Sequence, residues 1–233
     1  MRTILSVAAL FFLVVSCASE VENQMVVTGN IDGLKKGTLL LQKVEDTVLV
    51  TVDSLVVAGD ATFEFIQPVE SPEMYYLSLA LSDGSMNEER IGFFGEAKPI
   101  QINSSLKQFG IDATVTGSEN EDLLKEYRKL MSRYTNRNLE LIEAAVKAQQ
   151  EGNDSLSQAF QLEQNKVLSR KYLATVNFAV KYNDYEISPY LMLTEIYDVN
   201  KKYLDTVYTS LTPKIKDSKY GKALESFIAK IEE

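Results

Sequence analysis

The sequence predicts an α+β protein, in which an N-terminal antiparallel β-sandwich or open barrel precedes a C-terminal helical domain with a long antiparallel helix hairpin. Residues 25–117 consist of short runs rich in valine, isoleucine, threonine and aromatic residues, separated by turn-forming pairs. After Gly117 the hydrophobic period changes from two to that of a helix. No low-complexity linker separates the halves, so we expect residues 118–233, the helical domain, to pack close to the sandwich.

Strands are indicated wherever apolar and polar residues alternate between turns. The alternation is clearest in "FEFI" and "YLSLAL", and pairs such as Asp32-Gly33 and Asp83-Gly84 supply turn chemistry. The predicted strands cover residues 25–31, 37–44, 47–57, 61–67, 74–81, 91–94, 99–103 and 112–117.

Helix signals dominate the second half. Ser118 and Glu121 form a capping-box pattern, and the helix that follows is predicted to run to about Gln150. Gly152 ends it, and a second helix is predicted over about 156–182. Pro189 suits the first position of a third helix, and shorter helices are expected near 201–211 and 218–231. The apolar stripe predicted for the first helix is Leu124, Tyr127, Met131, Tyr134, Ile142, Ala145 and Val146. The residues predicted to face inward in the last helix are Tyr220, Leu224, Phe227, Ile228 and Ile231.

The N-terminus has the pattern of an export signal. Arg2 precedes an apolar run over residues 4–15 that is shorter than the roughly 20 residues a membrane span needs. The run ends in "VVSC", which resembles the lipobox of bacterial lipoproteins. That resemblance implies a signal peptide over residues 1–16, cleavage between Ser16 and Cys17, lipidation of Cys17 and a tether over 17–24. An ordinary secretory signal and an incidental cysteine in an anchor helix are the alternatives.

Localisation follows from this N-terminus. Ala18 stands where an aspartate would favour inner-membrane retention, so we expect attachment to the outer membrane of the cell envelope, in a leaflet that the sequence leaves open. The expected partners are the membrane, through the lipid anchor, and other envelope proteins. Residues 17–117 carry a net charge of −9, which disfavours nucleic acid.

Residue types exclude several chemistries. The chain contains no histidine and one cysteine, which rules out Ser-His-Asp and Cys-His catalysis, a CxxC pair and histidine-ligated zinc. We therefore expect a protein that is not an enzyme, with no catalytic residue, no cofactor and no metal site.

Three weaker patterns are candidate sites. Asp83, Ser85, Asn87 and Glu89 alternate like the ligands of a calcium loop, although a solvated hairpin loop is the simpler interpretation. Glu88-Glu89 and other acids could contain a catalytic carboxylate pair, but no spacing selects two of them. A tyrosine-rich segment over 182–208 could line a groove for a peptide or sugar, or pack between helices. Its tyrosines are Tyr182, Tyr185, Tyr190, Tyr197, Tyr203 and Tyr208.

Several stretches resemble one lipoprotein family. They include "VVTGNIDGLKKGTLLLQKV", "DSLVVAGDATFEF", "IGFFGEAKPIQI" and "VTGSENEDLLKEYRKLM". The family carries an N-terminal domain of unknown function 4369, usually in front of a thioredoxin-like thiol–disulfide oxidoreductase domain. With no second cysteine, this sequence has no residue to which that activity could be transferred.

These observations lead to two functional hypotheses. The first is a lipid-anchored, non-enzymatic cell-envelope protein that acts through binding or assembly. The alternative is an accessory or docking partner of a separate thioredoxin-like oxidoreductase.

Overall fold

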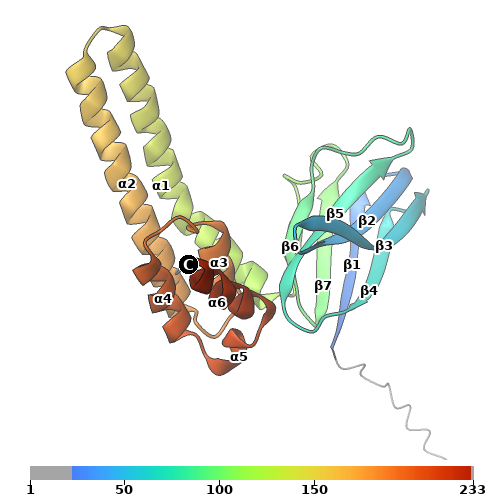
Figure 1. Cartoon of the computed structure of the whole chain (residues 1–233). Helices are drawn as coiled ribbons and strands as arrows, with labels where there is room; N and C mark the ends of the chain where they lie inside the picture. Colours follow the sequence, from blue (N-terminus) through green and yellow to red (C-terminus); the bar gives the residue numbers. More distant parts are fainter. Residues whose placement is uncertain (1–22, 232–233) are drawn as a thin grey trace, which may run out of the picture.

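The computed structural model of the chain describes residues 23–231, arranged as a β-sandwich and a helical lobe from which a long hairpin projects (Figure 1). The predicted signal peptide and the predicted cleavage and lipidation residues, Ser16 and Cys17, lie outside this range. The strands are β1 (Gln24–Asp32), β2 (Lys36–Glu45), β3 (Val48–Ala58), β4 (Thr62–Pro68), β5 (Glu73–Leu81), β6 (Ile91–Gly95), β7 (Pro99–Ser105) and β8 (Thr114–Thr116).

The strands form a sandwich. Within the described residues there are two four-stranded sheets, ordered β4-β1-β7-β8 and β3-β2-β5-β6. Burial alternates as a period of two requires: in β4, Phe63 and Phe65 face the core while Glu64 is exposed. The core between the sheets is apolar and includes Met25, Val27, Ile31, Leu39, Leu41, Leu77, Leu79, Phe93, Ile100 and Ile102. The predicted sandwich is confirmed, and its alternative, an open barrel, is not formed.

One strand pair departs from the predicted antiparallel arrangement. β1 lies parallel to β7, with Val27 opposite Ile100, while β4 on its other side is antiparallel. The chain crosses from the second sheet to the first between β6 and β7, and so enters beside β1 in the same direction as β1. Alternating burial is the same for either direction, so the sequence pattern could not reveal this pairing.

The helical lobe is built on the predicted hairpin, which is confirmed. Its helices are α1 (Glu119–Gln150), α2 (Asp154–Lys181), α3 (Ile187–Thr194), α4 (Lys201–Ser210), α5 (Pro213–Lys216) and α6 (Lys219–Ile231). The short helices α3 to α6 pack around the base of the hairpin, and the distal half of α1 and α2 extends beyond them (Figure 1). Their shared core includes Val176, Ala179, Met192, Ile196, Leu204, Val207, Ile215 and Leu224.

The predicted apolar stripe of α1 is wrong in the distal half of the hairpin, where no other helix among residues 23–231 covers it (Figure 1). Leu124, Tyr127 and Met131 are buried as predicted, but farther along α1 Ile142 and Val146 are exposed. Two helices without a third layer bury only the narrow seam between them, so residues beside that seam stay in contact with solvent. The buried seam here contains Leu141, Ala145 and Ala148.

Two smaller predictions about the later helices were also wrong. α3 begins at Ile187, which makes Pro189 its third residue rather than its first. The position is tolerated because the first N–H groups of a helix have no intrahelical acceptor. In α6, Ile231 is exposed, whereas Leu224 is buried as predicted.

An apolar contact joins the two lobes, as we expected from the absence of a low-complexity linker between them. Met74 and Phe94 lie on the outer face of β5 and β6 and pack against helical residues. The ring centroid of Phe94 lies 5.1 Å from that of Tyr190 and 6.2 Å from that of Tyr220. The Met74 N–H donates to the Tyr220 hydroxyl oxygen at 2.9 Å.

A buried polar network centred on Asn120 reinforces this contact. Its amide Nδ2 donates to Glu96 Oε1 at 3.1 Å and to Glu186 Oε2 at 2.9 Å, while its Oδ1 accepts from the Ile187 N–H at 2.8 Å. Glu96 Oε1 also accepts from Ser118 Oγ and from the Asn120 N–H, both at 2.8 Å. One side chain therefore connects the β6–β7 turn, the first turn of α1 and the start of α3.

We predict that this network depends on an uncharged amide at position 120. Asn120→Ala should lower the free energy of unfolding by about 2–3 kcal/mol, because buried partners lose their hydrogen bonds. Asn120→Asp should cost more, about 3–5 kcal/mol at neutral pH, because it adds a carboxylate between Glu96 and Glu186. Urea unfolding followed by far-UV circular dichroism measures both.

The excess cost of Asn120→Asp over Asn120→Ala should shrink in acid, where the carboxyl groups are protonated. Asn136→Asp, at an exposed position of the same helix, is the control and should change stability by at most about 0.5 kcal/mol. An aspartate at position 120 that costs no more than alanine at neutral pH would contradict this account.

Candidate functional site

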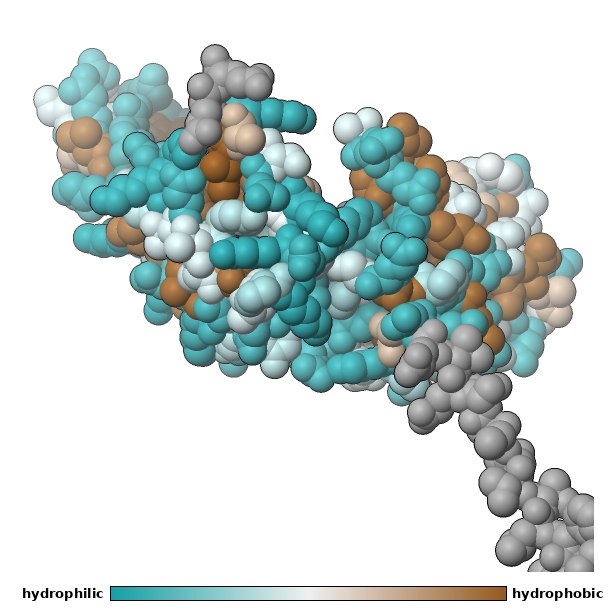
Figure 2. Space-filling view, turned by 60° about the horizontal axis from the view of Figure 1, so that its bottom comes forward, coloured by the Kyte–Doolittle hydropathy of each residue, from teal (hydrophilic) through white to brown (hydrophobic). Residues whose placement is uncertain are grey.

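A cleft of about 780 Å³ opens between the sandwich and the helical lobe. It lies where β6 and β8, which are the edge strands of the two sheets within the described residues, face the first turns of α1. In the space-filling view the two lobes meet at a largely hydrophilic junction with an indentation at its upper edge (Figure 2). The lining residues are Met74, Tyr76, Arg90, Ile91, Gly92, Gly110, Ala113, Thr114, Val115, Thr116, Glu121, Lys125, Arg128 and Tyr190.

Glu121 closes one end of the cleft by contacting β6. Its backbone N–H donates to Ser118 Oγ at 3.0 Å, so the half of the predicted capping box in which Ser118 caps α1 is confirmed. The reciprocal half of a capping box is not formed. The Glu121 carboxylate instead points to the sandwich, where Oε2 accepts from the Phe94 N–H at 3.1 Å. The Glu121 carboxylate therefore accepts a hydrogen bond from an N–H of the edge strand instead of from the N-cap.

The environment of Glu121 disfavours its charge. The side chain is only 3% exposed, and burial raises the pKa of this carboxyl group above the ordinary range of glutamate. The Phe94 N–H and the positive charge of Arg128, whose Nη1 lies 3.8 Å from Glu121 Oε1, oppose that rise.

Lys125 makes the corresponding contact with β8. One turn farther along α1, its Nζ donates to the backbone oxygen of Val115 and, at 3.2 Å, to Asp122 Oδ1. Glu121 and Lys125 are four residues apart and so lie on one face of the helix. That face supplies an acceptor to one edge strand and a donor to the other.

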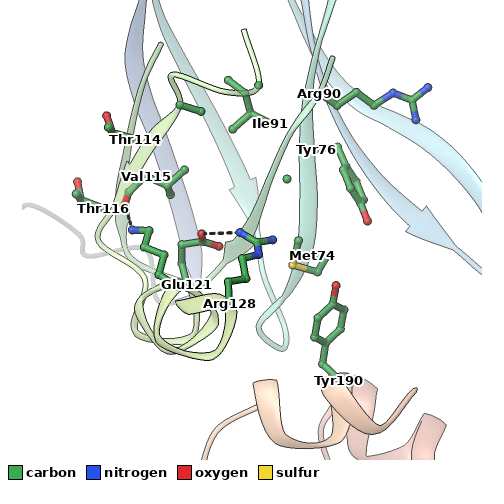
Figure 3. Close-up of a pocket in the computed structure, with 14 residues that line it drawn as sticks. Met74, Tyr76, Arg90, Ile91, Thr114, Val115, Thr116, Glu121, Arg128 and Tyr190 are labelled. Atoms are coloured by element: carbon green, nitrogen blue, oxygen red, sulfur yellow. Dashed lines mark hydrogen bonds and ion pairs between the residues drawn. The ribbon is translucent and has the colours of Figure 1, made fainter. Parts of the chain in front are cut away.

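Three cations surround the cleft. Arg90 precedes β6, and Lys125 and Arg128 come from α1. Arg128 is 57% exposed and extends from α1 across the cleft toward β5 and β6 (Figure 3). Against them the cleft has one carboxylate, that of Glu121, which is buried. This excess of positive charge contrasts with the net charge of −9 that residues 17–117 carry.

Two tyrosines add amphipathic surface to the cleft. The hydroxyl ends of Tyr76, from β5, and Tyr190, from α3, point toward each other across it (Figure 3). Burial raises the pKa of the Tyr190 phenol, so it stays a neutral donor and acceptor over the physiological range. Tyrosine offers a flat apolar face together with a polar tip.

The tyrosine-rich segment 182–208 does not form one groove. Tyr190 lines the cleft, but Tyr182 packs on Phe178 with its hydroxyl donating to Glu126 Oε1 at 2.8 Å. Tyr197 is 60% exposed. The other three contact different neighbours: Tyr185 lies near Glu119, Tyr203 packs on the α3–α6 core, and Tyr208 lies beneath Lys216. The alternative interpretation, helix packing, describes most of this segment.

Residues of the two remaining predicted patterns, the calcium-loop pattern and the Glu88-Glu89 pair, bond to nearby backbone groups. Residues 83–89 form the loop between β5 and β6, in which Asp83 Oδ1 accepts from the Ser85 N–H at 2.9 Å. Glu89 Oε2 accepts from the Gly110 N–H at 2.6 Å, and Glu88 is exposed. Among residues 23–231 no cluster of acidic side chains is arranged to hold a metal ion.

Sequence reasoning missed two groups of residues. Glu96 and Glu186 are buried around Asn120, and Arg90 and Arg128 belong to different lobes but share the cleft. These residues are far apart in the chain and belong to no motif, so only the packing of the lobes brings them together. Glu121 alone had a local signal, its place in the capping pattern.

Comparison with known families identifies the class of the first lobe. Residues 25–124 match the family described as "Domain of unknown function (DUF4369)". The chain therefore carries this domain, which spans the sandwich and the first six residues of α1, including Asn120 and Glu121. No curated protein matches the chain. Within residues 23–231 no helix has both the length and the apolar character that crossing a membrane requires.

We predict that neutralising Glu121 relieves a charge penalty. Glu121→Gln keeps an oxygen acceptor for the Phe94 N–H and removes the buried charge. Because the folded pKa is raised, folding favours the protonated acid, so the wild-type protein loses stability as the pH rises through that pKa. The variant should match the wild type in acid and exceed it at neutral pH in urea unfolding.

Glu119→Gln is the contrasting control. The hydrogen bond from Lys98 lowers the pKa of exposed Glu119, so its stabilising effect is present at neutral pH and lost as the pH falls. This variant should therefore be slightly less stable than wild type at neutral pH. If both variants changed the free energy of unfolding at neutral pH in the same direction, burial would not be what sets the pKa of Glu121.

Proposed function

We propose that the chain is a lipid-anchored, non-enzymatic protein of the cell envelope that binds an anionic ligand in the cleft between its lobes. The observation that carries the binding role is the gathering of Arg90, Lys125 and Arg128 around one cleft. The lipobox-like N-terminus supports the anchor, and the lack of histidine and of a second cysteine supports a role without catalysis.

The chemistry of the cleft suits a carboxylate-bearing ligand. Guanidinium groups form paired hydrogen bonds with carboxylates, and those of Arg90 and Arg128 are exposed to solvent. Arg90 has no ion-pair partner among the described residues, and Arg128 has only a long contact of 3.8 Å with Glu121. A ligand carboxylate could therefore bind either arginine without first displacing a strong internal pair.

The anchor is tested by replacing Cys17. Cys17→Ala should abolish labelling with a radioactive fatty acid and move the protein from the membrane fraction to the soluble fraction. Acyl chains contribute about 0.8 kcal/mol per buried CH₂, so their loss removes the anchor. Ser19→Ala, in the adjoining tether, is the control and should change neither result. Unchanged labelling of Cys17→Ala would refute the anchor.

The binding role is tested with short glutamate-rich and lysine-rich peptides of equal length. Fluorescence anisotropy should detect binding of the acidic peptide only, and the affinity should fall as salt is added. Arg90→Ala and Arg128→Ala should each weaken binding about two- to fivefold, because an exposed charge contributes at most about 1 kcal/mol.

Arg137→Ala is the matched control for Arg128→Ala. Both arginines lie on α1 and make one ion pair, and their side chains are 58% and 57% exposed. Only Arg128 lies in the cleft. An equal effect of the two substitutions would mean that net charge, rather than the cleft, attracts the peptide.

A further inference from the structure

The cleft exposes backbone as well as charge, because β6 is an edge strand. Within the described residues β6 pairs with β5 alone, with Tyr75 opposite Phe93 and Tyr76 opposite Gly92. Its other side faces α1, where the Phe94 N–H is bound by Glu121. An edge of this kind presents a row of donors and acceptors that another strand can use.

Gly92 is the part of this edge that α1 leaves uncovered. Backbone polar groups of successive strand residues point to opposite sides, so the N–H and C=O of Gly92 point to the same side as the Phe94 N–H. Gly92 lines the cleft, and no side chain among the described residues bonds to its backbone. It has no side chain of its own, and the space that one would take is filled by Tyr76 and Met74: a Cβ there would lie 3.3 Å from Tyr76 Cε1.

The surroundings of Gly92 indicate what chemistry could pair with it. Arg90 is two residues earlier on the same stretch of chain, and Arg128, from α1, lines the same cleft. Tyr76 lies directly opposite Gly92 on β5. An extended segment along β6 would therefore have cations near its side chains and an amphipathic ring beside its backbone.

We propose that the ligand of the cleft is an extended acidic peptide segment that adds to β6 as a further strand at Gly92. This inference rests on the proposed function and specifies its ligand. Main-chain hydrogen bonds to Gly92 provide the docking, and Arg90 and Arg128 select carboxylate side chains. Docking is limited to Gly92 from both ends of the edge: the Glu121 carboxylate already occupies the Phe94 N–H, and Gly110 lies against the backbone oxygen of Arg90, where a Cβ on Gly110 would be 3.2 Å from it. A compact anion would use the arginines and leave the strand edge unpaired.

The experiment uses the wild-type protein and a peptide of about nine residues in which glutamate and threonine alternate. Two N-methylated forms are compared with it, one methylated at every glutamate and the other at every threonine. In an added strand only alternate N–H groups face the partner. One form should therefore bind about tenfold or more weakly than the parent peptide, and the other should bind like the parent.

Amide hydrogen exchange gives an independent readout. The parent peptide should slow exchange of the Gly92 N–H, while the amides of β4, at the far edge of the other sheet, should not change. Polyacrylate, which has carboxylates but no peptide groups, should leave the Gly92 amide unaffected.

The outcomes separate this inference from the proposed function. Arg128-dependent binding of the parent peptide, with equal binding of both N-methylated forms and no protection of Gly92, would overturn strand addition and leave an anion site. Strand addition would also be overturned if polyacrylate displaced the labelled parent peptide as effectively as the unlabelled peptide does. A parent peptide that does not bind in an Arg128-dependent way would overturn the proposed function itself.

Discussion

The amide of Asn120 is the point on which the arrangement of the two lobes depends, because inside the protein it bonds α1 to two other segments, the β6–β7 turn and the start of α3. Buried polar groups need partners, and Asn120 provides donors to two carboxylates and an acceptor to the first N–H of α3. Glu96, which it binds, also caps the N-terminus of α1, where negative charge is favourable. The bonds are directional, so they set the angle at which α1 leaves the sandwich more narrowly than the apolar contact of Phe94 and Tyr190 could.

The angle of α1 decides the form of the cleft. With its N-terminus held at the β6–β7 turn, the next residues of α1 pass between the two edge strands. Glu121 then meets an N–H of β6, and Lys125 meets a carbonyl of β8. Exposed edges invite unwanted pairing, and proteins often cover them with a helix. Here the cover is partial. Side chains of α1 bond to one backbone group on each edge strand, the Phe94 N–H of β6 and the Val115 oxygen of β8. Gly92 is left facing a cleft that Arg90 and Arg128 also line.

The matched domain ends inside this arrangement. Residues 25–124 include the sandwich, Asn120 and Glu121, so the first turn of α1 belongs with the strands that it covers. Arg128 and Tyr190, by contrast, come from the helical lobe outside that range. The cleft is therefore composed of residues from within the matched domain and from outside it. Its binding properties depend on both parts.

The sequence by itself determined the strands, the hairpin and the Ser118 cap, because each depends on neighbours in the chain: alternating burial, helical periodicity and a capping residue. It also provided the Cys17 pattern, which stays a prediction. Only the tertiary structure decided that β7 runs parallel to β1, that Ile142 is exposed and that Glu121 turns toward Phe94. Each of these depends on which surfaces meet across long stretches of chain. For the same reason no local pattern could have placed Arg90 and Arg128 at one cleft, since only the packing of the lobes brings them there.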